Sequence, residues 1–182
     1  FRAQTVDPDS NEQRPETEAE TNERIKAYVE ANPQIVDVEL AAHGISVVQV
    51  LRRSGRWSYR KNSPFNRRIT GDTEIMLTGP AAGHPLLQTS DDPTGTMVKG
   101  TLNNCAAGQT AWGTYLSAEE NVDQYFGNFD AFEARAATDE ELNALDAHAR
   151  LPLPGSISNR GWEFAKDRFD VDKEPNEALR FG

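Results

Sequence analysis

The stretch ISVVQVLRRSGRWSYR, at positions 45–60, gives the clearest structural signal in this chain. Residues 45–51 are rich in β-branched side chains, which is typical of a strand buried on one or both faces. Ser54-Gly55 is a turn signal, and residues 57–60 alternate aromatic with polar side chains. We therefore predict a β-hairpin over this stretch and a mainly β fold.

The sequence downstream of the hairpin predicts further short strands. Proline and glycine interrupt positions 63–100 repeatedly, and the strand-like segments among them are residues 67–70, 74–77 and 96–102. Residues 112–116 are another strand candidate. Short strands joined by tight turns are typical of a β-propeller or a β-sandwich. No clear internal repeat decides between the two.

Three capping-box patterns, with Thr or Ser followed three residues later by Glu, predict where helices begin. The pattern at 17–20 predicts a helix to about residue 30, before the stop signal Asn32-Pro33. The pattern at 117–120 predicts a short helix to about residue 126, and that at 138–141 a helix to about residue 149. In the tail we expect Trp162, Phe164 and Phe169 to be anchors.

The composition is acidic. Of 182 residues, 29 are Asp or Glu and 19 are Lys or Arg, which gives a formal charge of −10. This charge argues against an electrostatic grip on nucleic acid or on an anionic membrane, and it suits hard cations such as calcium. An acidic surface also serves solubility alone. No apolar run approaches the roughly 18–20 residues that span a bilayer.

Cys105 is the single cysteine, so this sequence cannot form an intramolecular disulfide. The alternatives are a buried inert thiol, a thiol with a partner elsewhere, or a metal ligand or nucleophile. Asn103 and Asn104 precede it and small residues follow, which predicts a strand that ends in a tight turn. Such a turn lets a ligand approach from one side, although a crowded turn also favours a small side chain.

Glu119 and Glu120 follow the predicted strand at 112–116. If Cys105 and this pair end two adjacent strands, they converge at one rim of a sheet. Clustered carboxylates favour a hard cation, and a neighbouring thiolate favours a softer transition metal. The competing interpretation is structural: Glu120 completes a capping box, and Glu119 adds favourable negative charge to the start of a helix.

Other polar residues give weaker signals. His43, His84 and His148 are far apart in the sequence; His148 falls on a polar helix and is expected to face solvent, whereas His84 follows a glycine-rich bend and could serve a site. Arg67-Arg68 could hold a phosphate through bidentate hydrogen bonds or form a solvated strand edge.

Several strings occur in one order along the chain: AAHGISVV at 41–48, NRRIT at 66–70, LTGPAAGH at 77–84, DPTGT at 92–96, GTLNNCAAGQTAWGTYLSAEEN at 100–121 and RFG at 180–182. Together they resemble the PhoX-type alkaline phosphatases over most of residues 35–182. One departure is Ala111, where the family usually has proline. This change should alter the stiffness of a turn rather than remove a ligand.

The resemblance implies part of a six-bladed β-propeller with helical insertions, which hydrolyses phosphate monoesters with iron and calcium. Residues 1–34 would be an acidic helical leader and residues 35–182 a partial propeller. The family's iron-binding cysteine maps onto Cys105, and its Glu-Glu-Asn motif maps onto Glu119, Glu120 and Asn121, with Glu120 as a calcium ligand and Glu119 beside it. The resemblance assigns no catalytic residue within this sequence.

The resemblance also implies a protein exported to the periplasm, and we expect a monomer that acts on a phosphate monoester without nucleic acid or membrane partners. The sequence starts with Phe1 and stops at Gly182 in an apolar segment, so both ends look like cuts. We therefore expect an internal piece that is inactive by itself. The alternative is a non-catalytic, calcium-stabilised propeller module that serves binding.

Overall fold

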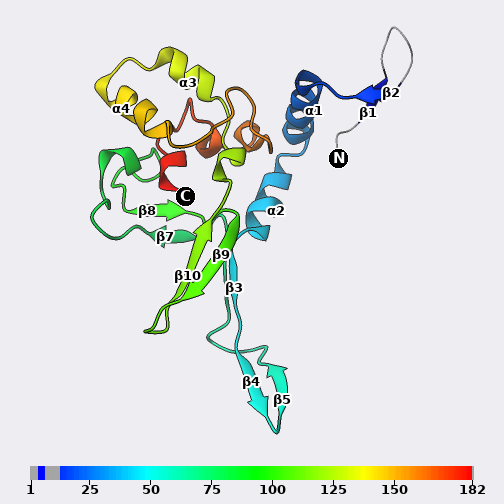
Figure 1. Ribbon diagram of the computed structural model, residues 1–182, viewed down its shortest axis with the longest axis vertical. Coiled ribbons are helices and arrows are strands. Elements are labelled where there is room, and N and C mark those ends of the chain that lie inside the picture. Colours follow the sequence, from blue (N-terminus) through cyan, green and yellow to red (C-terminus); the bar gives the residue numbers. More distant parts are fainter. Residues whose placement is uncertain (1–3, 7–12, 182) are drawn as a thin grey trace.

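The computed structural model describes residues 4–6 and 13–181. The chain ends at 1–3 and 182, and part of the acidic stretch at 7–12, lie outside the described residues. Figure 1 shows a body of helices and turns at one end of the molecule and long, narrow β structure at the other. No helix within the described ranges is long and apolar enough to cross a membrane.

The described part of the chain contains four α-helices, and strong local signals predicted two of them. They are α1 (Glu18–Ala31), α2 (Gln34–Ala42), α3 (Phe129–Arg135) and α4 (Asp139–His148). The capping boxes at Thr17 and Thr138 are both formed, which confirms the predicted starts of α1 and α4. Asn32 ends α1 as predicted, but Pro33 then occupies the N-cap position of α2, which the sequence had not indicated. Proline is compatible with a helix start because a backbone N–H there needs no partner within the helix.

The described strands are short and pair only in twos. They are β1 (Gln4–Val6), β2 (Gln13–Pro15), β3 (Ile45–Val47), β4 (Val50–Arg53), β5 (Arg56–Tyr59), β6 (Arg67–Ile69), β7 (Glu74–Met76), β8 (Met97–Lys99), β9 (Asn104–Gln109) and β10 (Tyr115–Glu119). The antiparallel pairs are β1–β2, β3–β6, β4–β5, β7–β8 and β9–β10. The expected strands at 67–70 and 74–77 are thus confirmed, and the one at 96–102 is confirmed for Met97–Lys99 only. The described residues contain no four-stranded blade and no closed propeller, so the β character is confirmed but the propeller is not.

The predicted hairpin at 45–60 is correct only in its outer half. The segment 45–51 is not one strand: it divides after Val47, so that β3 pairs with β6 while β4 pairs with β5. At this division the side chain of Asn66 accepts a hydrogen bond from the backbone N–H of Gln49 at 2.8 Å, in place of a pairing between strands. Nor is the segment fully buried, since all its residues are exposed or half-buried. We call residues 45–69 the arm.

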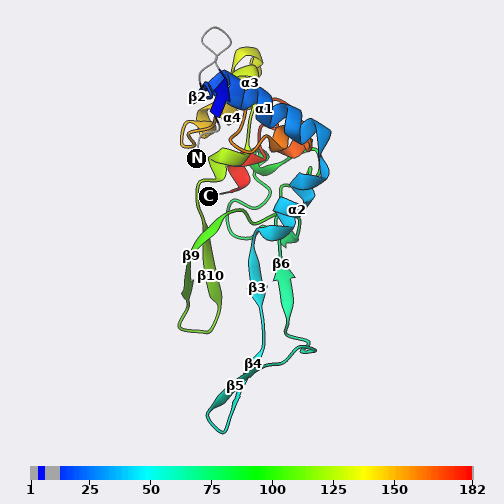
Figure 2. The same ribbon diagram turned by 90° about the vertical axis from the view of Figure 1, so that its right-hand side faces the viewer.

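The arm leaves the body directly after α2 and forms one end of the long axis (Figures 1 and 2). Gly44 makes this exit possible. Its φ of +95° is a conformation that L side chains rarely adopt, and a Cβ there would collide with the carbonyl of Ile69. Arg68 secures the same junction, because its guanidinium donates to the carbonyls of Ala42 and His43 at the end of α2.

The buried core consists of helices, 3₁₀ turns and loops, and none of the strand residues with described side chains is fully buried. Its centre is Trp162, whose ring lies 4.5 Å from that of Tyr125 and 4.8 Å from that of Phe169, centroid to centroid. The expected anchors Trp162 and Phe169 are confirmed, and Phe164 is half-buried at the edge of the core. The main buried side chains are Val29, Val36, Leu40, Leu102, Phe126, Phe132 and Phe181.

A buried ionic cluster holds the C-terminal segment to the rest of the body. The carboxylate of Glu177 accepts from Arg168 at 2.8 Å and from Arg180 at 3.1 Å. Arg180 also donates to Thr89 at 2.7 Å, and Arg168 to the carbonyls of Gly71 and Lys99 beside the β7–β8 pair. Because these partners lie far apart in the sequence, the cluster fixes several loops at once.

Candidate functional site

The candidate metal ligands lie at the inner end of the β9–β10 hairpin. The strands pair from Tyr115 opposite Gln109 down to Glu119 opposite Asn104. Trp112 lies in the turn between them rather than in a strand, and it is 80% exposed. The capping box predicted at 117–120 is wrong, because Ser117 and Glu119 are part of β10; a 3₁₀ turn at Val122–Tyr125 follows instead.

A β-bulge places Cys105 at this end. Ala118 faces Ala106 and Glu119 faces Asn104, so Cys105 is the extra residue on β9. A bulge bends the strand and redirects a side chain, and bulges are common beside active sites. The prediction that Cys105 ends a strand is therefore wrong: it lies within β9, and its thiol is exposed rather than buried.

The bulge brings Cys105 next to Glu120. Hydrogen bonding to the Glu120 carboxylate, together with its negative charge, raises the pKa of the Cys105 thiol above its ordinary value. Both residues are exposed. A thiol and a carboxylate thus lie side by side near the inner end of the hairpin, and the bulge rather than a strand end brings them together.

Glu119 lies differently from its neighbour. Its Oε1 atom accepts from the Thr101 hydroxyl at 2.6 Å and from the backbone N–H of Leu102 at 2.7 Å. Glu119 therefore ties β10 to the chain that leads into β9. The predicted pair divides into one half-buried carboxylate engaged with the backbone and one exposed carboxylate beside the thiol.

Asn103 connects the two strand ends. Its side-chain amide donates to the carbonyl of Glu120 at 2.6 Å, and its own carbonyl accepts from the N–H of Glu120 at 3.2 Å. Asn103 has φ +46° and Asn121 has φ +50°. Asparagine adopts this left-handed conformation more readily than most residues, so the two asparagines bend the chain on either side of Cys105 and Glu120.

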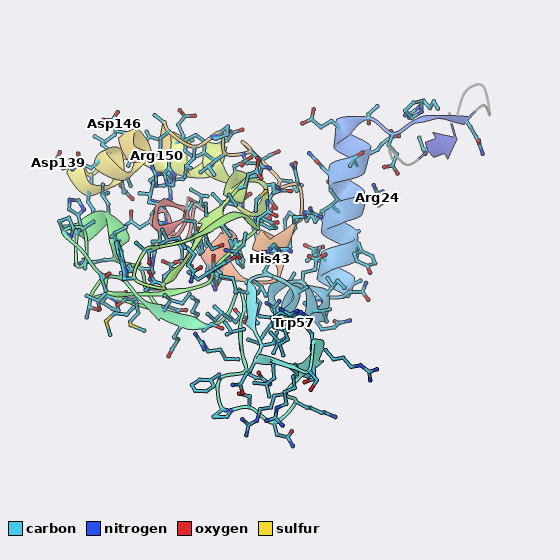
Figure 3. The ribbon with its side chains drawn as sticks, turned by 60° about the horizontal axis from the view of Figure 1, so that its bottom comes forward. Arg24, His43, Trp57, Asp139, Asp146 and Arg150 are labelled. Atoms are coloured by element: carbon cyan, nitrogen blue, oxygen red, sulfur yellow. The ribbon has the colours of Figure 1, made fainter. Side chains whose placement is uncertain are left out.

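His43 holds Asn103 in place through a hydrogen bond. The sequence did not indicate that His43 is part of this site. Its Nδ1 accepts from the N–H of Asn103 at 2.9 Å, and its ring meets Tyr125 and Trp162 edge-on. Figure 3 shows it at the junction of α2 with the body. Burial lowers the pKa of His43, which favours the neutral ring that this hydrogen bond needs. Sixty residues separate it from Asn103, and no local pattern signals the contact.

The other polar candidates lie elsewhere. His84 caps the 3₁₀ turn at Pro85–Leu87 through Nδ1. The expectation that His148 faces solvent is wrong: it is buried, and its Nε2 donates to the carbonyl of Pro175 at 2.6 Å. Arg68 is engaged with the end of α2, and Arg67 donates to the carbonyl of Phe65. The two guanidinium groups therefore contact different backbone carbonyls.

A cleft of about 420 Å³ lies in the body beside β7 and β8. Charged side chains line it, but many of them pair with each other: Lys99 with Asp91, Arg180 with Asp92 and Lys173 with Asp167. Because these cations are already neutralised, the cleft offers little attraction for a phosphate. The end of the β9–β10 hairpin remains the better candidate.

The donor atoms at that end fit a metal site in kind but not in number. A thiolate suits iron, and a carboxylate suits calcium. Within the described residues, however, no group of three or more His, Cys, Asp or Glu side chains lies close enough to hold a metal ion. Cys105 and Glu120 would thus hold such ions only together with additional donors.

Comparison with known proteins identifies the family of this chain. The family described as alkaline phosphatase PhoX matches residues 12–182. The structure of Pseudomonas fluorescens PhoX in complex with vanadate, a transition-state analogue, matches with 40% sequence identity and a TM-score of 0.66. The match covers 79% of this chain but 23% of that protein. No curated protein sequence matches. The chain belongs to the PhoX alkaline phosphatase family.

Proposed function

We propose that this chain supplies Cys105 and Glu120 to the metal site of a phosphatase that hydrolyses phosphate monoesters. The observation that carries the proposal is the bulge in β9, which sets the thiol beside the carboxylate at an exposed strand end. A purely structural role would not require a bulge, a free thiol and an exposed carboxylate at one position.

The substrate class follows from the related structure. Vanadate is described there as a transition-state analogue, and such analogues bind where charge builds up on the reacting group. By analogy, the site completed around Cys105 would bind a phosphoryl group.

We assign different roles to the residues of the hairpin end. Cys105 would bind iron through its thiolate, and Glu120 would bind calcium through its carboxylate. Bound cations would neutralise the phosphate oxygens. Glu119 and His43 would position these ligands, Glu119 by holding the approach to β9 and His43 by holding Asn103.

The proposal includes a need for further donors, because two side chains do not complete either coordination shell. We accordingly propose that these 182 residues do not hydrolyse phosphate monoesters by themselves. Export to the periplasm and a monomeric state belong to the same proposal, and they rest on the family membership alone.

The test uses a longer protein in which this chain is joined to the remaining donors of the site, with cobalt(II) as a spectroscopic substitute for iron. Cobalt bound to Cys105 should give a thiolate charge-transfer absorption, and calcium binding should be measurable by calorimetry. We expect Cys105→Ser to abolish the absorption and Glu120→Gln to weaken calcium binding by at least about tenfold.

Glu133→Gln is the matched control, because Glu133 is an equally exposed carboxylate on α3. It should leave both measurements unchanged. An unaltered cobalt spectrum in Cys105→Ser would contradict the assignment of the thiol. Vigorous hydrolysis of p-nitrophenyl phosphate by the 182-residue chain alone, in the presence of the same metals, would contradict the need for further donors.

A further inference from the structure

Basic and acidic residues are concentrated in different parts of this chain, and the net charge does not reveal this separation. Positions 40–71 contain no acidic residue and seven basic ones: Arg52, Arg53, Arg56, Arg60, Lys61, Arg67 and Arg68. The remaining 12 basic residues stand against all 29 acidic ones, so the rest of the chain carries −17. The arm therefore combines a charge of +7 with a strongly acidic body.

The positive charges of the arm are not neutralised within the described residues. None of the seven side chains forms an ion pair with a described carboxylate. Arg68 is engaged with the end of α2, and the other six are exposed. Arg53 and Arg56 are even direct partners across the β4–β5 pair. Like charges placed opposite each other destabilise a hairpin. Binding to a polyanion would reduce the repulsion between Arg53 and Arg56.

One face of the β4–β5 pair is also apolar. Val50 faces Tyr59 and Arg52 faces Trp57, and the alternation along a strand puts both pairs on the same face. Trp57 is 67% exposed and Tyr59 is 56% exposed. Arg52 lies over the Trp57 ring at 5.7 Å. Tryptophan and tyrosine are enriched where proteins meet the membrane–water interface.

We propose that the arm docks on an anionic lipid bilayer, with Trp57 and Tyr59 at the interface and the arginines against the headgroups. Clusters of four to eight basic residues beside apolar side chains are typical of such binding. The ten residues from Ile45 to Ser54 span up to roughly 30 Å at strand spacing. At the tip of the arm, Arg53 and Arg56 therefore lie farther from the acidic body than the Debye length of about 8 Å, and Figures 1 and 2 show β4 and β5 standing clear of the rest of the chain.

The apolar face favours a bilayer over one rival, duplex DNA. A two-stranded ribbon fits the major groove, but duplex DNA offers little apolar surface to Trp57, Tyr59 and Val50. A bilayer interface accepts both the rings and the charges. This inference is independent of the phosphatase proposal, and it departs from the expectation that net charge excludes membranes.

Sedimentation with vesicles of phosphatidylglycerol and phosphatidylcholine in equal parts tests the inference on the 182-residue chain. Binding should occur there and be weak or absent with phosphatidylcholine alone. Arg56→Glu should reduce the partition coefficient roughly 25-fold, because each unit charge near an anionic surface changes it by about fivefold. Arg24→Glu on α1 changes the net charge equally and should have less than about threefold effect.

Trp57→Ala should also weaken binding to anionic vesicles. In a Trp112→Phe background, where Trp57 is the exposed tryptophan and Trp162 is buried, brominated lipid should quench the tryptophan fluorescence. Circular dichroism would establish that each variant is folded. Equal binding to neutral vesicles, equal losses in Arg56→Glu and Arg24→Glu, or stronger binding to duplex DNA than to anionic vesicles would each overturn the proposal.

Discussion

The body and the arm differ in how far apart in the sequence their contacts lie. In the body, Trp162 donates to Glu39 across 123 positions, and Arg168 reaches Gly71 across 97. In the arm, Asn66 holds Gln49 across 17 positions, and β4 and β5 are joined by a two-residue turn. The body thus depends on long-range packing, whereas the arm is determined by neighbouring residues.

This difference has a consequence for tolerance to substitution. A buried side chain of the body packs against residues from several segments, so its removal weakens the packing of all these segments. An exposed side chain of the arm contacts few residues, and its loss should leave the fold intact.

Trp162→Ala should have the largest effect, lowering the free energy of unfolding by about 3–5 kcal/mol. Trp162 is 1% exposed, and its Nε1 donates to Glu39 at 2.5 Å. Trp57→Ala in the arm is the matched comparison and should cost less than about 0.5 kcal/mol. Urea denaturation measures both. Equal destabilisation by the two changes would remove the distinction between body and arm.

Glu177→Gln should cost about 3 kcal/mol, because it leaves the buried guanidinium groups of Arg168 and Arg180 without their shared anion. Asp91→Asn removes one partner of the exposed Lys99 pair and should cost less than about 1 kcal/mol. Thermal unfolding of the two variants gives the comparison. A mild effect at Glu177 would mean that the C-terminal segment is held chiefly by apolar contacts.

Acid should destabilise the body through His148. Burial lowers the pKa of His148 below 6.5, and Arg150 lowers it further. A depressed histidine pKa means that the unfolded chain binds the proton more readily. Stability is therefore full above pH 6.5 and falls below it, by at most about 1.4 kcal/mol per pH unit.

Denaturation at a series of pH values between 5 and 8 measures this slope. His148→Gln should reduce the slope, and His43, whose pKa burial also lowers, should maintain the remainder. An unchanged slope in His148→Gln would contradict the prediction. The protection factors of amides in β4 and β5, which are corrected for the intrinsic pH dependence of hydrogen exchange, should be unaffected by His148→Gln, because the arm contains no histidine.

Thr138→Ala should have the smallest effect, about 1 kcal/mol. The Thr138 hydroxyl accepts from the N–H of Glu141 at 3.2 Å and so caps α4. Thr138→Ser keeps this hydroxyl and should be nearly neutral. Thermal unfolding compares the two variants, and an equal loss in both would show that the methyl group matters rather than the cap.

Local signals predicted much of the secondary structure. The capping boxes at Thr17 and Thr138, the Ser54-Gly55 turn and the strands around it depend on adjacent residues, so the sequence alone reveals them. The box at 117–120 failed because pairing with β9 competes with helix formation there. His148 was misplaced because α3, which was not predicted, covers it with Phe129 and Phe132.

The candidate ligands could be named from the sequence, but the geometry of the site and the contribution of His43 could not. The family resemblance pointed to Cys105, Glu119 and Glu120, and their assignment as ligands stays a prediction. The bulge at Cys105, the inward turn of Glu119 and the support from His43 depend on register and on contacts between distant segments. Such features have no signature in a single sequence.

The placement of the basic arm at one end of the long axis gives the chain a large permanent electric dipole. A molecule with such a dipole rotates in the electric field of a charged surface before it contacts that surface. The arm would therefore arrive first at any anionic boundary, and the acidic end would face away. On ion-exchange media the same chain should be retained by both cationic and anionic resins, in opposite orientations.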